Sequence, residues 1–229
     1  MTFFDCLLAA GVAVLCGLDR TAALQLMVSR PIVAAPLAGL VLGVPQLGLQ
    51  VGLLLELLWL GRLPVGASIP PDDTQVAVGA TFLAATLLPD GGVQPAVVIF
   101  CLLIAMPLAK CGQLFDRMAR RANDTLSRRA GRSVQSGNLQ AVDRMHLIGL
   151  GHFALASLLT FVVVAAAGSV LCAILMPSLI GLLEAPAPWM QLVFPLVGAA
   201  MILVSINVSR VLTLFSASFA SAMLMLWLL

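Results

Sequence analysis

Seven apolar runs make up more than half of this chain, and short segments rich in glycine, proline or charge separate them. The runs cover residues 3–18, 32–60, 76–88, 93–108, 147–175, 193–206 and 211–229. Hydrophobic residues account for 61% of the chain and charged residues for 10%, whereas a soluble domain carries roughly a quarter charged residues. The sequence therefore predicts an integral membrane protein.

The lengths of the runs predict an all-α polytopic fold. A membrane-spanning helix needs roughly 20 apolar residues, so 229 residues have room for roughly six to eight transmembrane or re-entrant helices. Runs 3–18 and 76–88 are shorter than a full span and fit half-helices, tilted pieces or spans that include flanking polar residues. Run 32–60 is too long for one span, and Gly43 and Pro45 interrupt it. We expect two helical pieces there, with a turn between them.

The basic residues predict how the chain is oriented across the membrane. Eight of the twelve lysines and arginines fall within 110–144, and cytoplasmic loops collect such charge. We therefore predict that 110–144 is a basic cytoplasmic loop. Segments 89–92 and 177–191 contain no lysine or arginine and are expected outside. A patch for nucleic acid or anionic lipid is the less favoured interpretation of 110–144, since Phe115 is its only aromatic residue.

A carboxylate lies inside the second apolar run. Glu56 follows three leucines and precedes two leucines and Trp59. An ionised group at that depth is costly and normally faces a protein interior or a water-filled cavity. The glycines and proline of segment 61–66 break the helix after it, and such a break is tolerated where protein or a polar cavity satisfies the backbone. A carboxylate beside a broken helix is typical of a substrate site in a transporter.

Two interpretations of Glu56 remain open. In the first, its carboxylate accepts hydrogen bonds from sugar hydroxyls beside the flat apolar face of Trp59. In the second, it is a structural carboxylate paired with Arg62, although residues six apart do not share a helix face. We favour the first, and we include Gly66 and Ser68 of the broken segment in the predicted site.

Two aspartates end the broken segment. Asp72 and Asp73 follow two prolines, whose fixed φ and missing N–H prevent a helix before them. One of the two is therefore expected to be the N-cap of a helix that begins near Thr74. Since two neighbours cannot both cap one helix, we expect the other to face the same cavity as Glu56.

Two further polar residues are candidates for the same site. Gln113 follows the fourth run and Asn207 follows the sixth. The alternatives are a surface position for Gln113 and a side chain that snorkels to the membrane interface for Asn207.

No pattern in the chain predicts a cofactor. The five cysteines are dispersed without a CxxC motif, which argues against a disulfide framework or a zinc site. His146 and His152 are six residues apart and so lie on different helix faces, which disfavours a shared metal. No nucleotide-binding loop or nucleophile motif occurs. We therefore expect no cofactor and no metal.

Five segments together resemble the membrane subunit IIC of the mannose/fructose/sorbose family of sugar phosphotransferase systems. Segments 30–43 and 48–73 read RPIVAAPLAGLVLG and GLQVGLLLELLWLGRLPVGASIPPDD. The resemblance continues in MPLAKCGQL (106–114), in SGNLQAVDRMH (136–146) and in the pair Ile206-Asn207. These segments follow the family's order over most of the chain.

The resemblance implies one integral membrane transport domain over residues 1–229, in a bacterial inner (cytoplasmic) membrane. In that family, IIC and a IID subunit form a membrane complex through which sugar crosses. The sugar is phosphorylated by a phosphohistidine-bearing IIB subunit, which IIA recharges. IIC is not itself phosphorylated, so the resemblance implies no catalytic residue here and leaves open whether the chain counts as an enzyme. It places Glu56, Gly66 and Asp72 in the family's site segment.

The residues and the resemblance together predict a subunit that binds and translocates a hexose-like sugar. The expected partners are IID, IIB and IIA in an oligomeric complex within a lipid bilayer, and not nucleic acid. The predicted substrate-binding residues are Glu56, Trp59, Gly66, Ser68, Asp72, Asp73, Gln113 and Asn207. Two alternatives remain: a scaffold or regulatory membrane subunit without transport, and an ion-coupled transporter with Glu56 and Asp72 as proton or sodium sites.

Overall fold

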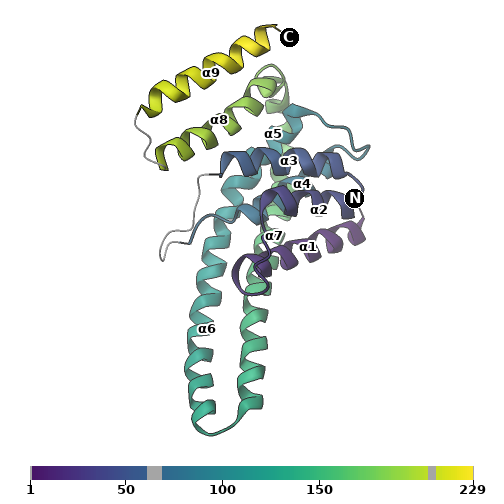
Figure 1. Cartoon of the computed structure of the whole chain (residues 1–229). Helices are drawn as coiled ribbons and strands as arrows, with labels where there is room; N and C mark the ends of the chain where they lie inside the picture. Colours follow the sequence, from purple (N-terminus) through teal and green to yellow (C-terminus); the bar gives the residue numbers. More distant parts are fainter. Residues whose placement is uncertain (1, 61–68, 206–209, 229) are drawn as a thin grey trace.

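The computed structural model describes residues 2–60, 69–205 and 210–228, and every regular element among them is helical (Figure 1). The elements are α1 (Phe3–Thr21), α2 (Pro31–Val41), α3 (Pro45–Leu58), α4 (Asp73–Leu87), α5 (Pro95–Leu108), the 3-10 helix η1 (Ala109–Cys111), α6 (Gly112–Gln135), α7 (Leu139–Glu184), α8 (Ala187–Ser205) and α9 (Val211–Leu228). The predicted all-α fold is confirmed.

The helices fall into long and short apolar classes. Within the described ranges, three continuous helical stretches are long and apolar enough to cross a membrane: Pro95–Gln135, Leu139–Glu184 and Ala187–Val204. Shorter apolar helices occupy Pro31–Val41, Pro45–Leu58 and Leu212–Met225. The short class agrees with the prediction that several runs are shorter than a full span.

Run 32–60 folds into two antiparallel helices, α2 and α3, as predicted. The turn between them contains Gly43, whose φ of 77° is in the left-handed region that glycine tolerates. Glycines also let the two helices approach closely, since a Cβ atom on Gly48 would overlap the carbonyl group of Ala35. Both helices begin with proline, which has no N–H group to leave unpaired in the first turn.

Replacing Gly48 by alanine should destabilise the protein because the added methyl group meets backbone atoms that cannot rotate away. Overpacking of this kind costs about 1–3 kcal/mol. Gly11 of α1 is the matched control, because a Cβ atom there would meet no atom within 4 Å. We expect a lower thermal midpoint for Gly48→Ala in detergent and an unchanged or higher midpoint for Gly11→Ala. Equal midpoints would contradict the close approach of α2 and α3.

Helix α4 is the centre of the bundle. Residues 74–85 are all buried, and α4 packs against α1, α2, α3, α5 and α7. Small residues make this possible, since Gly79 lies directly against the side chain of Val164 in α7. Burial on all sides fixes the helix and therefore fixes its N-terminus, where Asp72 lies.

Segment 110–144 is a helical hairpin and not an irregular loop. It comprises α6 and the first part of α7, joined at 136–138, and it extends beyond the other helices (Figure 1). Gly137 adopts a φ of 72°, and the side chain of Asn138 caps α7 by accepting a 3.0 Å hydrogen bond from the N–H of Ala141. Turn chemistry therefore explains both residues.

Segment 177–191, which the sequence predicts on the outside, is largely helical. Helix α7 continues through Pro177 to Glu184, and α8 begins at Ala187. A proline inside a helix removes one backbone hydrogen bond, but membrane helices tolerate it where neighbouring groups satisfy the freed backbone. Proline is therefore a weaker sign of a helix end in an apolar helix than in a soluble protein.

Candidate functional site

Polar side chains from distant parts of the chain meet where α1 and α3 end and where α2, α4 and α6 begin. The residues involved are Asp19, Arg20, Ser29, Arg30, Glu56, Asp72, Asp73, Thr74 and Gln113. We call this group the polar cluster. Its members are joined to one another and to the backbone by hydrogen bonds and ion pairs, so it is a connected feature of the fold.

Glu56 is paired with Arg30. The Nε of Arg30 donates to Oε1 of Glu56 at 2.8 Å, its terminal guanidinium nitrogen contacts the same oxygen, and the N–H of Ile32 donates to Oε2 at 3.3 Å. The Glu56 side chain is only 13% exposed, whereas that of Arg30 is 43% exposed. The ion pair is therefore accessible mainly from the arginine side.

The partner of Glu56 differs from the one considered in the sequence. Arg62 lies outside the described residues, and Arg30 comes from the start of α2. The sequence did contain the information for the Arg30–Glu56 pairing, because an antiparallel hairpin that turns at Gly43 places residues 30 and 56 opposite each other.

Arg20 holds the segment that leads into α4. Its guanidinium donates to the carbonyl oxygens of Pro70 and Pro71 at 3.4 and 3.1 Å. It also lies 2.7 Å from Oδ1 of Asp72 and 3.5 Å from Oδ1 of Asp73. Since prolines have no N–H, their carbonyl groups are the only backbone polar groups of this dipeptide, and Arg20 satisfies both. No local pattern in the sequence singled out this arginine.

Asp72 is the N-cap of α4, which confirms one half of the prediction for the aspartate pair. Its Oδ1 accepts a hydrogen bond of 3.0 Å from the N–H of Gln75. Asp73 lies in the first turn, where its Oδ1 accepts from the N–H of Thr74 at 3.0 Å. The structure brings Asp73 to Arg20, and whether it shares a cavity with Glu56 remains a prediction.

Asp19 organises the connection between α1 and α2. It is only 5% exposed, and its two carboxylate oxygens accept from the N–H groups of Leu26 and Ser29 at 2.7 and 2.9 Å. Three non-glycine residues of this connection have left-handed φ angles: Leu24, Gln25 and Met27. Such conformations cost about 1–3 kcal/mol each and persist where the surroundings fix them, often beside ligand sites.

This strained connection is joined to the rest of the polar cluster. The hydroxyl of Thr74 donates to the carbonyl of Ser29 at 2.8 Å, which ties the residue before Arg30 to the start of α4. Asp19 and Thr74 therefore act together on the position of Arg30. No local pattern in the sequence points to either residue, since their partners lie elsewhere in the chain.

The other predicted site residues have separate outcomes. Gln113 donates from Nε2 to the carbonyl of Ile69 at 2.8 Å, so it fastens α6 to the segment held by Arg20. Trp59 is the half-buried C-cap residue of α3 and packs against the hydrophobic core. Gly66, Ser68 and Asn207 lie outside the described residues.

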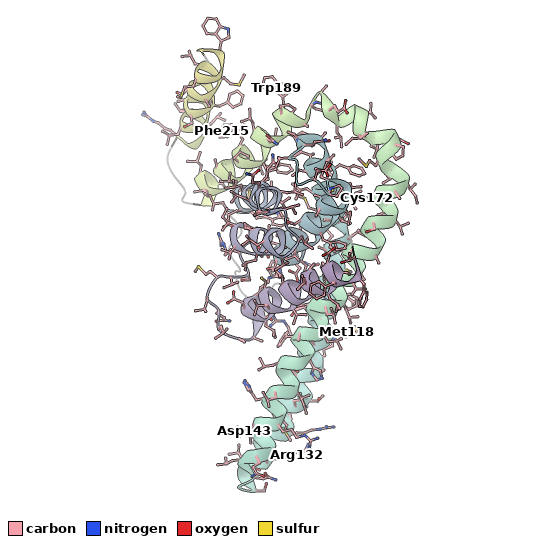
Figure 2. All side chains as sticks on the ribbon, turned by 90° about the vertical axis from the view of Figure 1, so that its right-hand side faces the viewer. Met118, Arg132, Asp143, Cys172, Trp189 and Phe215 are labelled. Carbon is pink, nitrogen blue, oxygen red and sulfur yellow. The ribbon has the colours of Figure 1, made fainter. Side chains whose placement is uncertain are left out.

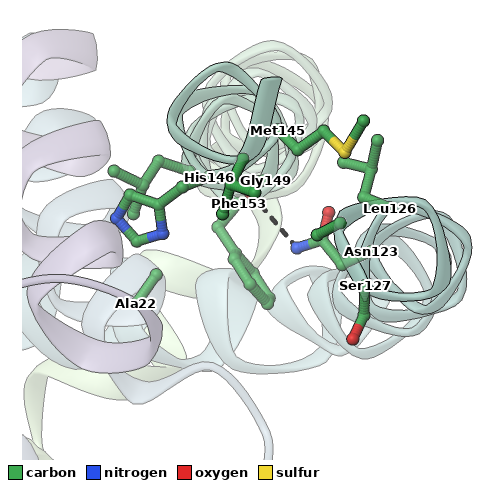
Figure 3. Close-up of a pocket in the computed structure, with 11 residues that line it drawn as sticks. Ala22, Asn123, Leu126, Ser127, Met145, His146, Gly149 and Phe153 are labelled. Carbon is green, nitrogen blue, oxygen red and sulfur yellow. Dashed lines mark hydrogen bonds between the residues drawn. The ribbon is translucent and has the colours of Figure 1, made fainter. Parts of the chain in front are cut away.

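The two histidines lie away from the polar cluster. His146 lines a cavity of about 370 Å³ between the α6–α7 hairpin and Ala22 (Figure 3). His152 contacts Oδ1 of Asn123 through Nδ1 at 2.6 Å, and Nδ2 of Asn123 donates to the carbonyl of Gly149. In the part of the chain that the structure describes, no group of three or more His, Cys, Asp or Glu side chains is arranged to hold a metal ion.

The fold and the polar cluster define a polytopic helical membrane protein whose polar cluster lies where α1 and α3 end and where α2, α4 and α6 begin. The family model described as PTS system sorbose-specific IIC component matches residues 3–228. The chain therefore belongs to this family of sugar phosphotransferase system (PTS) membrane subunits.

Individual relatives agree with this assignment. The fructose permease IIC component of Bacillus subtilis is 32% identical over 136 residues, which are 59% of this chain and 48% of the relative. The mannose-specific EIIC component of Escherichia coli K12 is 30% identical over 121 residues, which are 53% of this chain and 43% of the relative. Each alignment thus spans about half the length of the relative or less.

Two solved structures share the fold. One is titled "CryoEM Structure of Mannose Transporter ManYZ and Microcin E492 (MceA) complex"; it has a TM-score of 0.63 and 23% identity, over 97% of this chain and 87% of that chain. The other is titled "Structure of membrane protein" and has a TM-score of 0.69 and 24% identity, with the same coverage. These likenesses establish the arrangement of helices.

Proposed function

We propose that this chain is the sugar-translocating IIC subunit of a mannose-family phosphotransferase system. It binds a hexose-like sugar and passes it to the cytoplasmic side, where a IIB partner phosphorylates it. The observation that carries the proposal is the Arg30–Glu56 ion pair, whose carboxylate is only 13% exposed and which joins the start of α2 to the last turn of α3 in an apolar bundle. Ionisable side chains at membrane depth are costly, and where they occur they normally mark a substrate or ion pathway.

The chemistry of the polar cluster suits a hydroxyl-rich solute. A sugar hydroxyl both donates and accepts, and the cluster offers carboxylate acceptors at Glu56, Asp72 and Asp73 beside guanidinium donors at Arg20 and Arg30. Charge-assisted hydrogen bonds are roughly twice as strong as neutral ones. The predicted binding set of Glu56, Trp59, Asp72, Asp73 and Gln113 remains a proposal, together with Gly66, Ser68 and Asn207.

The proposed partners follow from the family. Mannose-specific and sorbose-specific EIIC components are among the relatives, and the ManYZ title names a mannose transporter. We therefore expect a IID subunit in the membrane complex and soluble IIB and IIA subunits that carry the phosphoryl group. We also propose that the membrane is the bacterial inner membrane, and that no residue of this chain transfers phosphate.

Transport by reconstituted vesicles tests this proposal against both alternatives. Vesicles that contain this chain and its IID partner should take up labelled mannose or fructose only when phosphorylated IIB is present on the acceptor side, and the product should be a sugar phosphate. Uptake driven by a proton or sodium gradient without a phosphoryl donor would favour the ion-coupled alternative. Absence of uptake under both conditions, with the complex intact, would favour a scaffold.

The proposed orientation of the hairpin predicts a labelling pattern. Ser127 lies on α6 and is exposed, and we place this hairpin on the cytoplasmic side. In a background without the native cysteines, Ser127→Cys should resist an impermeant thiol reagent added to intact cells and should react after the cells are opened. Gly92→Cys, in the connection between α4 and α5, is the opposite-side control. Rapid labelling of Ser127→Cys in intact cells would overturn the orientation.

A further inference from the structure

A small polar cavity lies beside the polar cluster, where α1, α6 and α7 meet the segment that leads into α4. Its volume is about 20 Å³. The polar side chains on its walls are Arg20, Thr21, Asp72, Asp116, Ser157 and Thr160. Asp116 belongs to α6, two residues before Met118, and Figure 2 shows Met118 where the hairpin leaves the bundle, with Arg132 and Asp143 near its far end. The cavity therefore joins the base of the hairpin to the polar cluster.

Two glycines bring the helices around this cavity close together. A Cβ atom on Gly17 of α1 would overlap Oγ of Ser157 in α7. A Cβ atom on Gly112, at the start of α6, would lie 3.1 Å from Oγ1 of Thr160 and 3.2 Å from Cβ of Asp72. Small residues allow such close approach between helices. They also leave room for a cavity at a point where hydroxyl and carboxylate groups from different helices meet.

One carboxylate oxygen of a wall residue has no partner in the protein. The Asp116 side chain is 15% exposed, and its Oδ2 accepts from Nε of Arg120 at 2.8 Å. Its Oδ1 is buried and makes no hydrogen bond with any described residue. A buried carboxylate oxygen without a donor is costly, and nearly all such atoms in folded proteins are paired. Oδ1 of Asp116 therefore requires a donor.

A hydroxyl group on the same cavity is also unpaired. Ser157 is 7% exposed, and its Oγ makes no hydrogen bond within residues 2–60, 69–205 and 210–228. Thr160, on the same helix, instead donates to the carbonyl of Ala156 at 2.8 Å. A serine hydroxyl can donate and accept, whereas an ionised carboxylate can only accept. Ser157 and Asp116 thus line one cavity with complementary groups that do not bond to each other directly.

Phe153 encloses the cavity on the side of the hairpin. Its side chain lines both this cavity and the larger one between the hairpin and Ala22, where Figure 3 shows it. The guanidinium of Arg120, which pairs with Asp116, lies 5.7 Å from the centre of the Phe153 ring. The Asp116–Arg120 pair therefore contacts the ring that separates the two cavities.

We propose that one water molecule is bound in the small cavity as a fixed part of the fold. A volume of about 10–15 Å³ suffices for a water molecule, and a buried water makes about three hydrogen bonds. The water donates to Oδ1 of Asp116 and accepts from the hydroxyl of Ser157, which satisfies both groups. Its second O–H is available to the carboxylate of Asp72. A metal cation is disfavoured because the guanidinium groups of Arg20 and Arg120 are both close to the site.

A structure of the complete chain at a resolution that shows ordered water tests the proposal directly. We expect a water peak about 2.5–3.0 Å from both Oδ1 of Asp116 and Oγ of Ser157. Absence of this peak where other buried water is visible would overturn the proposal, and so would a direct hydrogen bond between the two side chains. A peak surrounded by several oxygens at distances shorter than hydrogen bonds would identify a metal cation and would also contradict it.

Removing the hydroxyl should have opposite effects with and without a bound water. With the water, Ser157→Ala loses a hydrogen bond and should lower the thermal midpoint of the complete chain in detergent by about 2–4 °C. Ser169 is exposed on the same helix, so Ser169→Ala is the matched control, and its midpoint should be unchanged or higher because alanine has the higher helix propensity. An unchanged or higher midpoint for Ser157→Ala would refute the proposal, because loss of a hydroxyl without any partner does not destabilise the fold.

A shared water also predicts that Asp116 and Ser157 are energetically coupled. Asp116→Ala and Ser157→Ala together should lower the midpoint by less than the sum of the two single changes, because each removes a partner of the same water. Asp116→Ala combined with Ser169→Ala should instead give additive shifts. Additive shifts in both pairs would show that Asp116 and Ser157 do not share a bound water.

Discussion

Replacing Glu56 by glutamine should lower the affinity of the assembled complex for its sugar by at least about tenfold. The change removes the charge that strengthens the hydrogen bonds of this side chain to Arg30 and to the proposed sugar, and hydrogen bonds to charged groups contribute about 1.5–3 kcal/mol. The change is nearly isosteric, so the complex should still assemble. Equilibrium binding of labelled sugar to the purified complex measures the effect.

The second glutamate of the chain supplies the matched control. Glu184 is exposed at the end of α7, and Glu184→Gln should bind sugar with unchanged affinity. Arg30→Gln should resemble Glu56→Gln. The double variant should be little weaker than either single variant, because both changes break the same ion pair. Unchanged affinity in Glu56→Gln would remove this residue from the proposed sugar site.

Replacing Arg20 by methionine should destabilise the polar cluster and abolish sugar transport. The change leaves the carboxylate of Asp72, whose side chain is 13% exposed, without its ion-pair partner, and it removes the donors to two proline carbonyls. Loss of one partner from a buried pair costs roughly 3–5 kcal/mol. For a chain of this size we expect the thermal midpoint in detergent to fall by roughly 10 °C.

Three companion variants separate the ion pair from a general effect of losing an arginine. Arg129→Met on the exposed face of α6 should leave the midpoint unchanged. Arg20→Lys should recover only part of the stability, because lysine lacks the planar fork that reaches several oxygens. The double variant Arg20→Met with Asp72→Asn should be more stable than Arg20→Met alone, since it removes the unpaired charge. If the double variant is instead less stable, the proposed cause is wrong.

Local patterns predicted the features of this fold that depend on one stretch of chain. The turn at Gly43 follows from an apolar run too long for one helix, and the cap at Asp72 follows from the two prolines before it. Helix α7 continues past the end of apolar run 147–175 and through Pro177, since a membrane helix tolerates a proline where neighbouring groups satisfy the freed backbone.

The membrane class and the division of 32–60 into two helices were determined by the sequence, because hydropathy and helix breaks act locally. Only the tertiary structure decided that Arg30 meets Glu56 and that Arg20 holds Asp72. These partners are 26 and about 50 residues apart, and many arginine–carboxylate pairings satisfy the same composition. The packing of the helix ends determines which arginine lies next to which carboxylate, and a buried charge is stabilised only by a partner that this packing places within contact distance.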